Sequence, residues 1–258
     1  MRFPDRPAGD SLLDIAGAVK RRDGADRAFA LAVPRLTLHR GRAMAFVGPS
    51  GSGKSTLIDL LAMTLKPDTT RRFVFCDPHD GQSTDLMGLW QAGAMDALAR
   101  LRSRHFGYVL QTGGLLPFLS VYENIALPQR LLGFHRAEVI RDLARRLDIA
   151  ETLGAMPSKL SVGQRQRVAI ARALAHQPTI VLADEPTASL DPMNAVIVMD
   201  LFMELIDKVH ATLVIATHDG TLVQRYGLPI VAAEVRRRGN TVETTFGDSL
   251  AMPAHGAV

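Results

Sequence analysis

A glycine-rich segment after a short apolar run carries the strongest chemical signal in the sequence. The segment GPSGSGKST matches the pattern GxxxxGK[ST] and comes directly after Ala43–Val47. Glycines at this spacing let successive backbone N–H groups face a phosphate, and the N-terminus of a following helix favours the same anion. The pattern therefore predicts a nucleoside triphosphate site, whereas a chance glycine-rich turn is the weaker reading in this strand–loop–helix context. The predicted nucleotide-binding residues are Gly48, Pro49, Ser50, Gly51, Ser52, Gly53, Lys54, Ser55 and Thr56.

Two side chains of this loop have separate predicted roles. The Lys54 ammonium should reach the β- and γ-phosphates and count among the catalytic groups. The Ser55 hydroxyl should ligate Mg²⁺. These roles predict Mg²⁺ as the cofactor of a bound nucleoside triphosphate.

Two consecutive acids provide the second half of the predicted site. Asp184 and Glu185 directly follow an apolar run, residues 180–183. A carboxylate at the carboxyl end of a buried strand can hold Mg²⁺ through its water shell, which is the role predicted for Asp184. Glu185 would project over the γ-phosphate and polarise an attacking water. The alternative, a strand end followed by an acidic turn, is weakened by the phosphate loop.

Three further motifs follow the phosphate loop in a fixed order. They are FGYVLQ, which ends at Gln111, LSVGQRQRVAIARAL at residues 160–174, and ATHD, which contains His218. Together with the two segments above, they resemble the ATP-binding subunit of ABC transporters. The second of these motifs resembles the signature of that family, and a signature followed by a DEPT-type segment is highly specific.

The alternation of strand-like and helix-like patterns predicts an α/β fold with a mostly parallel sheet. The resemblance makes this a P-loop NTPase (an ABC ATPase) that also has antiparallel β elements and a helical subdomain. We expect a single ATP-binding domain over 1–258, with its core at about 10–110 and 166–248 and a helical insertion at about 112–165. Locally, the leucines from Leu57 to Leu65 predict one helix that Pro67 ends. A hairpin is predicted around Gly239-Asn240.

The resemblance also implies roles for residues outside the phosphate loop. Gln111 would bind nucleotide and Mg²⁺, and His218 would bond the γ-phosphate and orient the attacking water with Glu185. Taken alone, Gln111 is a polar strand end, His218 an ordinary surface histidine, and the signature arginines a solvated helix face. The resemblance implies ATP as the nucleotide, and the residues implied to bind the ATP of a second, head-to-tail copy are Ser161, Gly163 and Gln164. Asp191 would lie at the interface and couple the two sites.

The sequence departs from the family pattern at two places. Val162 stands where the usual LSGGQ has its first glycine, which requires a negative φ at that position. The family often stacks adenine on an aromatic residue well before the phosphate loop. Arg22 falls at this place and Phe29 lies nearby, and the sequence does not decide between them.

The segments LADEPTASLD and QTGGLLPFLSVYENIALP most resemble the lipoprotein-releasing, macrolide-exporting and cell-division branch (LolD-, MacB- and FtsE-like) of the family. This implies export or extraction of a substrate through a separate permease with a large extracytoplasmic domain, and a peripheral position on the cytoplasmic face of the inner membrane. The alternative is an FtsE-like mechanotransmission ATPase that moves a membrane partner without transport. The residues that could receive the permease, or could simply form the core of the insertion, are Leu115, Leu116, Phe118, Leu119 and Tyr122.

Composition limits the other classes. The 258 residues carry 30 Lys and Arg against 26 Asp and Glu, so the net charge of +4 gives no footprint for a nucleic-acid partner. One cysteine excludes a disulfide framework, and no apolar stretch approaches the length of a membrane span. Arg236–Arg238 could touch acidic lipids or form a solvated hairpin tip. The transported substrate, and homodimer against pairing with a paralogue, stay open.

Overall fold

A computed structural model of the chain describes residues 11–22, 28–238 and 241–247. It divides into two compact units. One, the phosphate-loop unit, contains residues 1–99 and 214–258, and the other, the signature unit, contains residues 100–213. The prediction of one domain with a helical insertion stays a prediction, and each unit is described by itself.

A six-stranded sheet forms much of the phosphate-loop unit, with the strand order β10-β11-β2-β1-β4-β5. All neighbours are antiparallel except β11 and β2, which are parallel. The predicted C-terminal hairpin is confirmed as β10 and β11, although its turn residues Gly239 and Asn240 lie outside the described residues. The strands are β1 (Ser11–Arg22), β2 (Ala28–His39), β4 (Arg72–Cys76), β5 (Ser83–Asp85), β10 (Glu234–Arg238) and β11 (Thr241–Thr245).

The strands that position the phosphate loop are short and apolar. In β3 (Ala43–Val47) all residues but the last are buried, and this strand pairs in parallel with β9 (Ile230–Ala232). Strand β8 (Thr212–Thr217) begins in the signature unit and ends in this one, where the Gly48 N–H donates to the Thr217 carbonyl at 3.4 Å. The helices of this part are α1 (Lys54–Leu61), α2 (Leu86–Gln91) and α8 (Gly220–Arg225), and α3 (Met95–His105) runs on into the signature unit.

Helix α1 is shorter than predicted. It ends at Leu61, and Met63 just beyond it has a left-handed backbone with φ 57°. Leu65 therefore lies outside the helix, so the leucine spacing was right for one face but wrong for the end.

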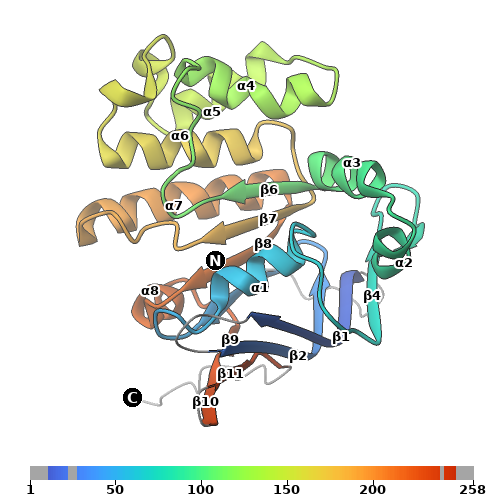
Figure 1. Cartoon of the computed structure of the whole chain (residues 1–258). Helices are drawn as coiled ribbons and strands as arrows, with labels where there is room; N and C mark the ends of the chain where they lie inside the picture. The colour runs from blue at the N-terminus through green and yellow to red at the C-terminus, as the bar shows by residue number, and fades with distance from the viewer. Residues whose placement is uncertain (1–10, 23–27, 239–240, 248–258) are drawn as a thin grey trace. The chain divides into compact units, whose positions relative to one another are not determined.

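The signature unit is built on two parallel strands, β6 (Phe106–Val109) and β7 (Ile180–Asp184). Helix α6 packs against β6 and against α4, α5 and α7 (Figure 1). Ile140, Leu143 and Leu147 recur at three and four residues and are all buried, so they form one apolar face. The helices are α4 (Val121–Leu131), α5 (Ala137–Arg146), α6 (Val162–Leu174) and α7 (Pro192–Val209), with 3-10 turns at Ala150–Thr152 and Pro157–Lys159.

Among the described residues, no helix has both the length and the apolar character needed to cross a membrane.

Candidate nucleotide-binding site

The predicted phosphate loop connects β3 to α1, as its strand–loop–helix context requires. Gly53 is the N-cap of α1 and has φ 86°, a left-handed conformation that favours glycine. A Cβ at Gly53 would lie 2.3 Å from Cζ of Phe29, so a side chain there would also clash. The loop thus ends at the positive N-terminal end of α1, and loop N–H groups and a helix N-terminus together form an arrangement that binds phosphate.

The Lys54 side chain lies along this loop. It is 5% exposed, and its Nζ donates to the carbonyl oxygens of Gly48 at 2.9 Å and Pro49 at 3.1 Å. These contacts hold a full positive charge beside the backbone of the loop. An anion bound by the loop N–H groups would therefore meet the ammonium without a large rearrangement.

The structure places both candidates for contact with adenine. Arg22 and Phe29 are cross-strand partners in the β1–β2 pair, and Arg22 is exposed while the Phe29 ring packs against Gly53. This position favours Phe29, because the far edge of its ring lies beside the loop that would hold the phosphates. The assignment of the stacking residue stays a prediction.

Replacing Phe29 by Ala should weaken ATP binding about tenfold, because stacking of a base on an aromatic ring contributes about 1–3 kcal/mol. Calorimetric titration with ATP and with inorganic tripolyphosphate separates two roles. A base-stacking ring affects ATP alone, whereas a ring that only supports the loop affects both ligands. Arg22→Ala is the matched variant, and a loss of ATP affinity there but not in Phe29→Ala would assign the contact to Arg22.

His218 lies at the end of a neighbouring strand, β8. It follows β8 directly and is exposed, and Asp219 caps α8 by accepting from the Leu222 N–H at 2.9 Å. Because Gly48 bonds to Thr217, the carboxyl ends of β3 and β8 lie side by side. The phosphate-loop unit therefore brings the loop and His218 to one edge.

The two acids lie at the carboxyl end of β7 in the signature unit. Asp184 is the last residue of β7, and the residue before it, Ala183, pairs with Val109 at the end of β6. Gln111 follows two residues after Val109, so it begins the loop beside Asp184. Both acids are buried, while Gln111 is exposed. Oxygen donors of this kind are those that Mg²⁺ prefers.

Glu185 has a strained backbone. Its φ is 47°, a left-handed conformation that costs a non-glycine residue about 1–2 kcal/mol. The Ala188 N–H donates to the Glu185 carbonyl at 3.2 Å and so closes a turn directly after the residue. Strain at a buried carboxylate that follows a strand is typical of a functional position.

The signature segment starts helix α6. Ser161 is the N-cap and forms a capping box with Gln164, in which the Gln164 N–H donates to Ser161 Oγ at 3.2 Å and the Ser161 N–H donates to Gln164 Oε1 at 2.9 Å. Val162 is 43% exposed and is the first residue of the helix, and its φ is not positive, which confirms the negative φ predicted for it.

An open cavity of about 520 Å³ lies at this helix start. Asp191 belongs to it and caps α7, where it accepts hydrogen bonds from the backbone and the side chain of Asn194 at 3.1 and 2.7 Å. These bonds, that from the side chain above all, lower the pKa of the Asp191 carboxyl. The structure thus brings together the implied second set of nucleotide contacts. The residues that line the cavity are Asp148, Ser161, Val162, Gly163, Gln164, Arg167, Ser189, Leu190, Asp191 and Asn194.

Some of these residues were not predicted from the sequence. The sequence alone places Arg167 among the arginines of a solvated helix face. In the structure it donates to the Leu147 carbonyl at 3.1 Å and contacts Asp148 Oδ2 at 3.3 Å. Its contacts with Asp148 and Leu147 join residues about 20 positions apart, so helical spacing alone gave no signal for them.

The residues predicted to receive a permease are only partly exposed. Phe118 is 71% exposed, whereas Leu115, Leu116, Leu119 and Tyr122 are half-buried. Their role at a docking surface stays a prediction.

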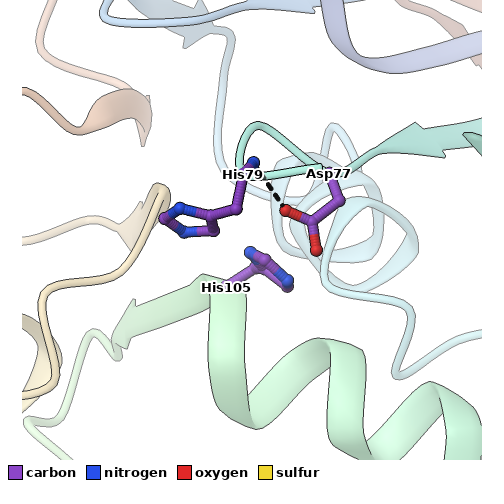
Figure 2. A group of neighbouring side chains, drawn as sticks. All are labelled: Asp77, His79 and His105. Carbon is purple, nitrogen blue, oxygen red and sulfur yellow. Dashed lines mark hydrogen bonds between the residues drawn. The ribbon is translucent and has the colours of Figure 1, made fainter. Parts of the chain in front are cut away.

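Other polar groups form local bonds away from these motifs. In the phosphate-loop unit the His79 N–H donates to Asp77 Oδ1 at 2.8 Å, as Figure 2 shows. In the signature unit, Nδ1 of His105 lies 3.2 Å from Thr179 Oγ1. Each contact fixes a turn or a strand start within its own unit.

The comparisons with known proteins agree with the motifs. Residues 31–188 match the family described as ABC transporter. The chain is 37% identical over 224 residues to the lipoprotein-releasing system ATP-binding protein LolD of Shewanella denitrificans, covering 85% of this chain and 91% of that protein. It is 41% identical over 192 residues to the macrolide export ATP-binding/permease protein MacB 2 of Yersinia pestis bv. Antiqua, covering 73% of this chain and 26% of that protein.

A solved structure is similar as well. The ATP-binding cassette MJ0796, as a dimer in a post-hydrolysis state with ADP and Pi, has a TM-score of 0.71 and 29% identity, covering 86% of this chain and 94% of that one. This likeness confirms the predicted α/β cassette fold. This chain belongs to the ABC transporter family, as a subunit that binds and hydrolyses ATP.

Proposed function

We propose that the chain powers the release or export of a substrate from a membrane through a separate permease, while it lies on the cytoplasmic face of that membrane. The LolD relative supports this proposal, since it is named as the ATP-binding protein of a releasing system and is matched over 91% of its length. The MacB relative, named for export, supports the same direction of transport.

The nucleotide is held first by the phosphate loop. Backbone N–H groups of the loop and the Lys54 ammonium bind the β- and γ-phosphates. Ser55, Gln111 and Asp184 supply oxygen donors for Mg²⁺, which would neutralise charge on the phosphates when bound. In this proposal Glu185 accepts a proton from the attacking water, and His218 bonds the γ-phosphate and orients that water.

A second copy of the chain completes each site. The observation that carries this step is the cavity at the start of α6, where the signature residues and Asp191 lie together. The N-terminus of a 13-residue helix binds anions, so this cavity fits the γ-phosphate of an ATP held by another copy. ADP lacks that phosphate and would not hold the two copies together.

Light scattering on Glu185→Gln tests the shared site. We expect a dimer with ATP–Mg²⁺ and a monomer with ADP–Mg²⁺, since only ATP supplies the phosphate that both copies bind. Equal masses with the two nucleotides would contradict the proposal.

Gly163 offers a second variant for this experiment. A Cβ there would meet only Leu190 Cδ2 at 3.8 Å, so a side chain fits the folded chain. Gly163→Glu in the Glu185→Gln background should stay monomeric with ATP because its carboxylate repels the incoming phosphate, whereas Gly163→Ala should still dimerise. A dimer in the Glu variant would show that this cavity does not receive the phosphate.

A further inference from the structure

A partly buried arginine connects the loop after Gln111 to the signature helix. Arg172, in the last turn of α6, donates from Nη1 to the Gly114 carbonyl at 2.8 Å and from Nη2 to the Gly113 carbonyl at 2.9 Å. The guanidinium therefore holds two consecutive peptide groups at once. These carbonyls begin two residues after Gln111, whose implied role is to bind Mg²⁺.

The surroundings explain how a partly buried cation is accommodated there. Burial lowers the pKa of Arg172, so the protein environment disfavours the charge. Two carbonyl dipoles and the negative C-terminal end of α6 offset part of that cost. A shorter apolar residue at position 172 would avoid the cost of desolvating a charge. We therefore attribute the role of Arg172 to its hydrogen bonds with the loop carbonyls.

The face of α6 that carries Arg172 also contacts the loop at Gly113. A Cβ at Gly113 would lie 3.5 Å from the Arg165 carbonyl and 3.8 Å from Ala169 Cβ. Positions 165, 169 and 172 follow one another at four and three residues, which places them on one helix face. Gly113 and Gly114 therefore lie against α6 between Arg165 and Arg172, and the rigid helix connects these contacts to Ser161 at its start.

The conformation that Arg172 holds is unusual for the backbone. Gly113 and Gly114 have φ of 73° and 57°, and a Cβ at Gly114 would lie 2.4 Å from Leu110 Cδ1. Two left-handed glycines in sequence form a flexible joint in the unfolded chain. The bidentate contact selects one arrangement of this joint.

We propose that Arg172 is a positioning residue that fixes the segment after Gln111 onto the signature helix, so that Gln111 and Ser161 move as one body. This inference rests on the proposed roles of those two residues. Displacement of the loop by a partner would then tilt α6 and its signature, and closure on ATP at the signature would move Gln111.

A double-mutant cycle tests the connection. Arg172→Met keeps the length of the side chain and removes its donors, and we expect kcat to fall about tenfold and the Mg²⁺ midpoint to rise, as when an outer partner of a metal ligand is lost. In the Gln111→Ala background the same change should cost less than about twofold, because the residue it positions is already absent. An equal loss in both backgrounds would mean that Arg172 only stabilises the fold and would overturn the proposal.

A hydrolysis-independent measurement accompanies the cycle. Hydrogen exchange over residues 111–116 should become at least about tenfold faster in Arg172→Met, while Arg145→Met, on the exposed face of α5, should leave it unchanged. Gly114→Ala should behave like Arg172→Met, because it displaces the loop while keeping the arginine. Unchanged exchange in both Arg172→Met and Gly114→Ala would contradict the proposal for Arg172. A lack of ATPase activity would count against the proposed function alone and would leave this exchange test valid.

Discussion

Glu185→Gln should lower kcat for ATP hydrolysis by about 10²- to 10⁴-fold and leave ATP affinity within about twofold of the wild type. The amide keeps the shape of the side chain and the left-handed backbone at φ 47°, but it cannot accept a proton from water. A rate loss without a binding loss is the signature of a group that acts in the transition state. Steady-state phosphate release and calorimetric titration with ATP measure the two quantities.

Glu204→Gln is the matched control for this change. Glu204 lies on the exposed side of α7 and forms an ion pair with Arg146 at 3.1 Å. Its carboxylate has no role in any proposed step of hydrolysis. We expect wild-type hydrolysis from this control. If Glu185→Gln also hydrolysed ATP at the wild-type rate, Glu185 would not be the catalytic base.

Lys54→Ala should weaken ATP binding by about 10²-fold or more, since charge-assisted hydrogen bonds contribute about 1.5–3 kcal/mol each and the ammonium would bond two phosphates. In the structure its Nζ already lies on the loop, bonded to the carbonyls of Gly48 and Pro49. Removing it deletes the positive charge and the side-chain hydrogen bonds to both carbonyls, although the Pro49 carbonyl still accepts from the Ser52 N–H at 3.2 Å. Titration calorimetry with ATP, with and without Mg²⁺, measures the loss.

Lys66→Ala, which changes an exposed lysine beyond α1, should bind ATP as the wild type does. A thermal unfolding scan of Lys54→Ala shows whether the loop still folds. Unchanged ATP affinity in a folded Lys54→Ala protein would contradict the proposed phosphate site.

The sequence predicted those parts of the molecule whose residues lie close together along the chain. The phosphate loop, the strand before Asp184 and the helix that starts after Ser161 are local patterns, and the structure has each of them. The long strands β1 and β2 were not predicted, because alanines and Gly17, with φ 64°, interrupt the alternation that marks a strand.

The contacts that organise the candidate site were even less predictable. Arg172 bonds Gly114 across 58 residues, and no spacing in the sequence indicates which arginine of α6 turns inward. The left-handed backbone of Glu185 is equally invisible, since an acid after a strand is compatible with many turns. Such features depend on packing between distant segments, which a single sequence does not display.

The division of the chain also has a consequence for how the protein is made. The signature unit is one continuous stretch, residues 100–213, whereas the phosphate-loop unit needs both residues 1–99 and those from 214 onward. Strand β2 pairs with β11, so its partner leaves the ribosome some 200 residues later in synthesis. During translation the surface proposed to meet the γ-phosphate can therefore form first, whereas the sheet that contains β2 is complete only after β11 has been synthesised. A nascent chain halted before β8 would carry the signature without a finished loop, and the cell would need to shield the exposed edge of β2 until translation is complete.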